Sequence, residues 1–114
     1  ATAWNTSEMG EAVRAFGEIF GTTDTAWLVG YPYWADSRLV GFNAGLPASD
    51  IAIFPEQIPA TFEISLPKMF IVNLQDTATL ELLRSLYPQG SLTEYPSRVG
   101  MNFYIYLALP AQIP

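Results

Sequence analysis

The sequence contains neither cysteine nor histidine among its 114 residues. Without cysteine, the chain forms no disulfide bond and offers no zinc–thiolate site or thiol nucleophile. Without histidine, it lacks the base of Ser-His-Asp and Cys-His catalysis and also the commonest metal ligand in proteins. The chain is therefore poorly equipped for hydrolytic or transition-metal chemistry.

Basic residues are also scarce, with five lysines and arginines against eleven acids and a net charge of −6. The five bases are scattered, whereas a protein that neutralises phosphates needs clustered Lys and Arg. No G-x-G-x-x-G follows the first apolar strand, and neither a Walker A loop nor a G-x-S-x-G elbow occurs. We therefore expect no nucleic acid partner and no cofactor.

Long apolar runs are missing as well. No stretch reaches the roughly 18 consecutive apolar residues of a membrane helix, and no basic segment precedes an apolar one as in a signal peptide. The chain starts Ala1-Thr2-Ala3-Trp4, without an initiator methionine. We expect residues 1–114 to form a single α/β domain that is a fragment of a longer protein.

What the sequence does contain favours a packed core. Half of the residues are hydrophobic and 14% are aromatic. A chain of this length buries roughly two-thirds of the surface that it exposes when unfolded. The composition therefore predicts a folded domain and not a disordered segment.

Helical spacing predicts three helices. The first begins with Asn5 as N-cap and Glu8 three residues later, and it ends at Gly21. Its apolar stripe consists of Met9, Ala12, Val13, Phe16, Ile19 and Phe20. A short helix is predicted over Asp36–Ala44, and a third over Thr77–Tyr87 with Asp76 as its cap.

Apolar runs bounded by turn residues predict the strands, which are Ala26–Val29, Asp50–Phe54, Met69–Leu74, Ser91–Tyr95 and Asn102–Leu109. Residues 55–67 contain three prolines and are expected to cross a sheet edge or face, with a fragment of strand at 62–64. Strands joined through helices favour a doubly wound, mostly parallel sheet of about five strands. We expect the order 2-1-3-4-5, with an antiparallel hairpin at the C-terminus.

The first strand runs into an aromatic elbow, which we define as Tyr31, Pro32, Tyr33 and Trp34. Ligands of open α/β sheets bind at the carboxyl ends of strands, where the strand order reverses. In the expected order this point lies between the first and third strands. The elbow, with Asp36 and Arg38 after it, should meet Asn73 and Asp76 there.

Each of these side chains has a second interpretation. Asp36 and Asp76 could form a carboxylate pair for Mg²⁺ or Ca²⁺, but both stand at helix starts, and we favour N-capping. Tyr31, Tyr33 and Trp34 could stack against a sugar ring, or they could cover the sheet edge, which we favour. Arg38 could receive a phosphate or carboxylate, or it could pair with Asp36. No catalytic residue and no metal site is predicted.

Three segments carry a resemblance to a known family. They are Trp27-Leu28-Val29-x-Tyr31-Pro32-x-Trp34-x-Asp36-x-Arg38-Leu39-Val40-Gly41, Pro67-Lys68-x-Phe70-Ile71-Val72 and Tyr87-Pro88-Gln89-Gly90. With the aromatic last strand, they resemble the soluble C-terminal domain of bacterial polytopic membrane glycosyltransferases. The family is similar to the dolichyl-phosphate-mannose protein mannosyltransferase-like proteins of filamentous green bacteria. The resemblance covers most of the chain.

The resemblance implies an extracytoplasmic domain at the cell membrane, whose partner is the membrane-embedded part of its own polypeptide. The catalytic acids of that family lie in the membrane-embedded part, so none is carried over to this chain. The implied role is non-catalytic, in contact with a glycan, a lipid-linked sugar or a protein acceptor. The alternatives are an independent binding domain and a metal-assisted hydrolase or transferase that uses Asp36 and Asp76. Any ligand is expected to contact Tyr33 or Trp34 near Asn73.

Overall fold

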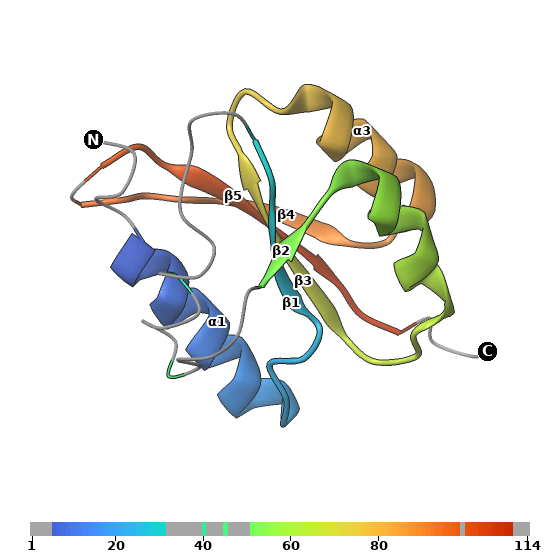
Figure 1. Cartoon of the computed structure of the whole chain (residues 1–114), viewed down its shortest axis with the longest axis horizontal. Helices are drawn as coiled ribbons and strands as arrows, with labels where there is room; N and C mark the ends of the chain where they lie inside the picture. Colours follow the sequence, from blue (N-terminus) through green and yellow to red (C-terminus); the bar gives the residue numbers. More distant parts are fainter. Residues whose placement is uncertain (1–5, 32–39, 41–44, 46–50, 99, 111–114) are drawn as a thin grey trace.

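A single open sheet of five strands, in the order β2-β1-β3-β5-β4, forms the centre of the protein (Figure 1). The computed structural model describes residues 6–31, 40, 45, 51–98 and 100–110. The strands are β1 (Ala26–Val29), β2 (Ala52–Ile53), β3 (Lys68–Asn73), β4 (Ser91–Tyr95) and β5 (Phe103–Ala108). β1 pairs in parallel with β2 and β3, whereas β5 pairs antiparallel with β3 and β4. The fold is therefore α/β with a mixed sheet.

The positions of the last two strands correct the expected order 2-1-3-4-5. β5 is inserted next to β3, and β4 forms the edge. Burial explains why β5, and not β4, lies next to β3. Phe103 and Tyr106 of β5 are buried on opposite faces of the sheet. In β4, by contrast, Ser91, Thr93 and Glu94 are exposed. A strand that is apolar on both faces suits the interior of a sheet, and a polar strand suits its edge. Because β5 pairs antiparallel with both β3 and β4, the sheet is mixed and not mostly parallel as expected.

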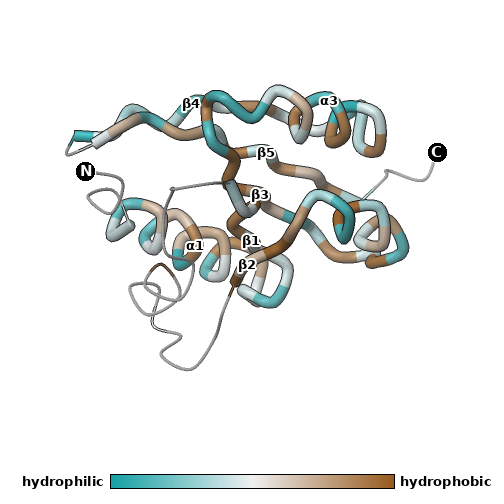
Figure 2. Tube along the Cα trace, turned by 45° about the horizontal axis from the view of Figure 1, so that its top comes forward, coloured by the Kyte–Doolittle hydropathy of each residue, from teal (hydrophilic) through white to brown (hydrophobic). Residues whose placement is uncertain are grey.

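Helical elements cover both faces of the sheet. The helix α1 (Thr6–Phe20) packs on one face, and the 3₁₀ helix η1 (Pro55–Glu63) and the helix α3 (Thr77–Leu86) pack on the other (Figure 1). In Figure 2 the hydrophobic residues concentrate along the central strands between these layers. Val29 and Val72, on the adjacent parallel strands β1 and β3, are both fully buried.

The first helix agrees with its prediction except at one side chain. Met9, Val13 and Phe16 are buried against β1 and β3. Ile19 does not belong to this stripe, because 72% of its side chain is exposed. The helix ends at Gly21, whose φ of 87° is readily adopted by glycine alone.

Residues 55–63 correct a second expectation. They form η1, so Phe62 and Glu63 belong to a helix and not to a fragment of strand. Pro55 occupies the first turn, where its missing N–H leaves no bond unmade. The Oε1 atom of Gln57 accepts a hydrogen bond from the N–H of Phe54, at 2.8 Å. The element covers the sheet with Ile58, which is fully buried.

The second half of the chain follows its predicted pattern closely. β3 and β5 lie within one residue of their expected bounds, and β4 matches them. Side chains of β5 alternate between the two faces of the sheet, with Phe103 on the α1 face and Tyr106 on the α3 face. The turn before β4 needs a glycine, because a Cβ atom on Gly90 would lie 2.3 Å from the Tyr106 ring.

One predicted element lies largely outside the described residues, and another is shorter than expected. Of the helix expected over Asp36–Ala44, the structure describes only Val40, which is helical and fully buried on the α1 face. Of the strand expected over Asp50–Phe54, Ala52 and Ile53 form β2. Asn5, the expected cap of α1, also lies outside the described residues.

Candidate functional site

The carboxyl ends of β1 and β3 lie side by side, as the sequence predicts. The parallel register pairs Leu28 with Ile71, and two more residues along each strand bring Gly30 opposite Asn73. Beyond Gly30 the chain enters the aromatic elbow at Tyr31. We call four described residues at this edge, Gly30, Tyr31, Asn73 and Asp76, the carboxyl-end site.

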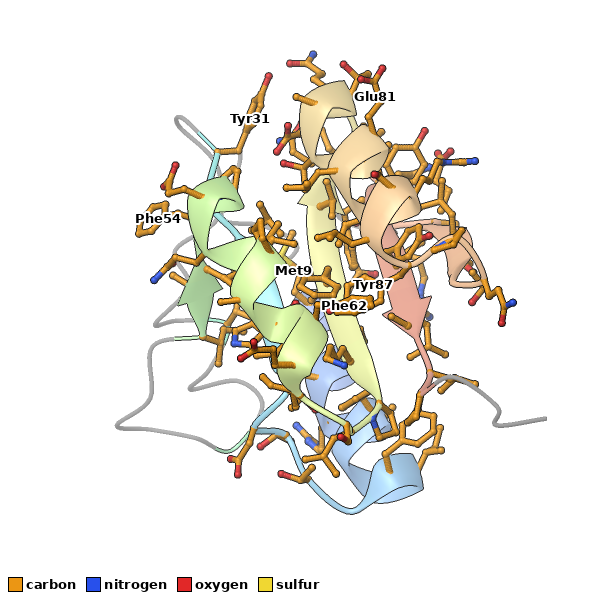
Figure 3. All side chains as sticks on the ribbon, turned by 90° about the vertical axis from the view of Figure 1, so that its right-hand side faces the viewer. Met9, Tyr31, Phe54, Phe62, Glu81 and Tyr87 are labelled. Atoms are coloured by element: carbon orange, nitrogen blue, oxygen red, sulfur yellow. The ribbon has the colours of Figure 1, made fainter. Side chains whose placement is uncertain are left out.

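Three of the seven predicted site residues are described, namely Tyr31, Asn73 and Asp76. Tyr31 is half-buried at the end of β1, and Figure 3 shows its ring projecting from the strand end, on the same side of the molecule as Glu81 of α3. Tyr33, Trp34, Asp36 and Arg38 lie outside the described residues. Their expected meeting with Asn73 stays a prediction.

Asn73 ends β3 with its side chain only 6% exposed. Its Oδ1 atom accepts a hydrogen bond from the N–H of Gln75 at 2.9 Å, and its carbonyl oxygen accepts one from the N–H of Asp76 at 3.0 Å. These bonds turn the chain from the strand toward α3. Within the part of the chain that the structure describes, the Nδ2 group of Asn73 has no acceptor.

Asp76 is the N-cap of α3, as we favoured from the sequence. Its Oδ1 atom accepts the Thr79 N–H at 3.2 Å, and its Oδ2 atom accepts the Thr79 hydroxyl at 2.6 Å. The carboxylate is 9% exposed and both of its oxygens are engaged in the cap. In the described ranges, no group of three His, Cys, Asp or Glu residues could hold a metal ion.

Sequence reasoning missed a buried lysine at the opposite end of β3. Lys68 is 3% exposed, and its ammonium group donates to the carbonyl oxygens of Ile64 and Leu66. It also lies 5.3 Å from the centre of the Tyr87 ring. The Tyr87 hydroxyl is within 2.7 Å of the Thr61 hydroxyl. This arrangement ties η1, β3 and the end of α3 together.

Burial shifts the pKa values of three groups in this region. It lowers the pKa of Lys68, because the charged ammonium loses water. It raises the pKa of Tyr87, against the opposing effect of the hydrogen bond with Thr61. It also raises the pKa of Tyr106, against the opposing effect of the positive charge of Arg84. The Tyr106 hydroxyl donates to the carbonyl oxygen of Tyr87.

These shifts predict opposite pH dependences of stability. Lys68 binds its proton less tightly in the folded chain, so the free energy of unfolding should rise with pH just below the ordinary lysine value of 10.5. Tyr87 and Tyr106 hold their protons more tightly when folded, so stability should fall above the ordinary tyrosine value of 10.0. Lys68→Met should abolish the rise and keep the fall.

Urea unfolding of the wild type and Lys68→Met, at pH values from about 8 to 11, measures both effects. Tyr87→Phe is the control, and it should keep the rise and weaken the fall. An unchanged rise in Lys68→Met would contradict the assignment.

A second feature that the sequence did not reveal is the contact of Glu8 with the loop between β4 and β5. We expected Glu8 to complete the capping of α1, but its carboxylate accepts the hydroxyl of Ser97 and, at 3.1 Å, the N–H of Arg98. Glu8 is 8% exposed. The residue therefore joins α1 to the β4–β5 loop, a contact across 89 positions that no local pattern signals.

Comparison of the chain with protein-family models, curated proteins and solved structures finds no match. The resemblance to a membrane glycosyltransferase domain therefore stays a prediction. Among the described residues, no helix is both long and apolar enough to cross a membrane.

Proposed function

We propose that this chain is a non-catalytic, extracytoplasmic binding module of a membrane glycosyltransferase. In this proposal the transfer chemistry belongs to the membrane-embedded part of the same polypeptide. The chain contributes contacts to a glycan, a lipid-linked sugar or a protein acceptor at the carboxyl-end site. The elbow residues Tyr33 and Trp34, next to Asp36 and Arg38, supply the expected stacking surface.

The non-catalytic part of this proposal rests on one observation, which is that the buried charged side chains form hydrogen bonds within the protein. Asp76 caps α3, Glu8 holds the β4–β5 loop, and Lys68 donates to two backbone carbonyls. A general acid or base must be free to exchange a proton with a substrate. These three groups are instead bonded to the protein itself, which favours binding over chemistry.

The metal-assisted alternative, with Asp36 and Asp76 as ligands, is less favoured for the same reason. Both oxygens of Asp76 accept hydrogen bonds from Thr79, and a metal ion would compete with them. Calorimetric titration with Mg²⁺ and Ca²⁺ separates the two proposals. Binding that is lost in Asp36→Asn would favour the alternative.

The purified chain is expected neither to hydrolyse nor to transfer sugar from a nucleoside-diphosphate sugar or a polyprenyl-phosphate sugar. Turnover that survives purification and is lost in Asp36→Asn would overturn the non-catalytic role. The complete reading frame tests the other half of the proposal. Hydrophobic spans upstream of this chain would support attachment to a membrane enzyme, and their absence would favour the independent binding domain.

A further inference from the structure

The side-chain amide of Asn73 is a buried polar group at the carboxyl-end site, and its hydrogen bonding among the described residues is incomplete. Its oxygen serves the Gln75 N–H, while its two Nδ2–H groups have no acceptor among the described interactions, although 94% of the side chain is buried. A buried donor without a partner destabilises a fold by about 1–3 kcal/mol. Such a group calls for an explanation by a water, an ion or a ligand.

The place of Asn73 in the fold favours a ligand. After β1 the chain leads to β2, which lies on one side of β1 in the sheet. β3 lies on the other side of β1 and is followed by α3. The connections that leave β1 and β3 therefore diverge at this edge, which is where open α/β sheets bind their ligands. Asn73 lies at the end of β3, and the parallel register places it opposite Gly30, which follows β1.

The chemistry of the site restricts the ligand. The free groups of Asn73 are donors, so they require an oxygen acceptor. The nearest described charge in the sequence is the carboxylate of Asp76, three residues further on, and the whole chain carries a net charge of −6. An anionic group would be repelled by both. A neutral hydroxyl, ring or carbonyl oxygen avoids this repulsion, and saccharides present such oxygens at high density.

We propose that Asn73 binds a neutral saccharide at the carboxyl-end site, through hydrogen bonds that its Nδ2 group donates to saccharide oxygens. This inference rests on the proposed binding function and narrows its ligand to an uncharged sugar. Tyr31, half-buried beside the site, offers an aromatic surface to the ring of the same sugar.

The decisive variant is Asn73→Asp, because the aspartate keeps the oxygen that accepts the Gln75 N–H and removes both donors. Gln75→Ala is the matched control, since Gln75 is an exposed neighbour whose backbone N–H remains. The probes are the methyl glycosides of glucose, mannose and galactose, with glucose 1-phosphate as the anionic counterpart. Binding is followed by calorimetry and by ¹⁵N–¹H NMR of the wild type and both variants.

At least one neutral glycoside is expected to bind the wild type and to shift the side-chain amide resonances of Asn73. Asn73→Asp should weaken this binding by at least about tenfold, and Gln75→Ala should leave it unchanged. Glucose 1-phosphate should bind no more tightly than methyl glucoside. The resonance shift is measured on the wild type, so it tests the inference even where Asn73→Asp fails to fold.

The outcomes separate this inference from the proposed function. Binding with unshifted Asn73 amide resonances, or binding that a folded Asn73→Asp retains, overturns the role of Asn73 and leaves the binding function standing. If glucose 1-phosphate binds more tightly than methyl glucoside, only the inference that the ligand is uncharged is overturned. Absence of any glycoside binding overturns the inference, and the attachment to a membrane enzyme is then judged by the complete reading frame.

Discussion

Replacing Phe70 with alanine is expected to lower the free energy of unfolding by about 3–5 kcal/mol. Phe70 lies in the central strand β3, and its side chain is fully buried. Its ring stacks on Trp27 at 5.3 Å between ring centres and lies 6.1 Å from Tyr87. The alanine would leave a cavity between the sheet and the α3 layer, which two rigid rings cannot fill.

The matched control is Phe62→Ala. Phe62 also contacts the Tyr87 ring, at 5.9 Å between ring centres, but 61% of it is exposed. Its loss should cost no more than about 1 kcal/mol, because little apolar surface returns to water. Urea unfolding measures both variants. A similar loss in the two variants would contradict the core that we describe.

Removing the carboxylate of Glu8 should have the second largest effect. Glu8→Ala is expected to lower the free energy of unfolding by about 2–3 kcal/mol, because hydrogen bonds to charged groups contribute more than neutral ones. The variant removes the carboxylate that accepts hydrogen bonds from the Ser97 hydroxyl and the Arg98 N–H. Amide hydrogen exchange should accelerate in the β4–β5 loop and at the start of α1.

Glu11→Ala serves as the control for Glu8→Ala. Glu11 lies one turn further along α1 and is exposed, so its replacement should change stability by no more than about 0.5 kcal/mol. Glu8→Gln should fall between the two, since the glutamine keeps one oxygen acceptor. Equal stabilities of Glu8→Ala and Glu11→Ala would show that the contact with the loop adds nothing.

Local patterns predicted the elements of this fold where they are strong and uninterrupted. The stripe of Met9, Val13 and Phe16 and the apolar run of β3 gave elements within a residue or two of the observed bounds. The patterns failed where proline interrupted them, because residues 55–63 carry no periodicity and form η1. A local signal exists in hindsight, since Pro55 and Gln57 are typical of the first turn of a helix.

The candidate site was predictable only in part. The carboxyl ends of β1 and β3 are adjacent because parallel strands joined by crossovers bring their ends to one edge, and the sequence indicates that much. Asp76 was recognised as a cap by its spacing from α3. The incomplete bonding of Asn73 and the burial of Lys68 depend on neighbours from other elements, so no pattern within their own segments signals them.

By itself, the sequence determined the types of elements, the parallel pairing of β1 with β3 and the alternation of side chains along β5. These follow from short-range periodicity, which the chain carries residue by residue. Only the tertiary structure decided that β5 lies inside the sheet and β4 at its edge, that Glu8 holds a loop far along the chain, and that Lys68 is buried. The reason is physical, because these outcomes depend on which surfaces exclude water once distant segments pack together, and local spacing does not encode that choice.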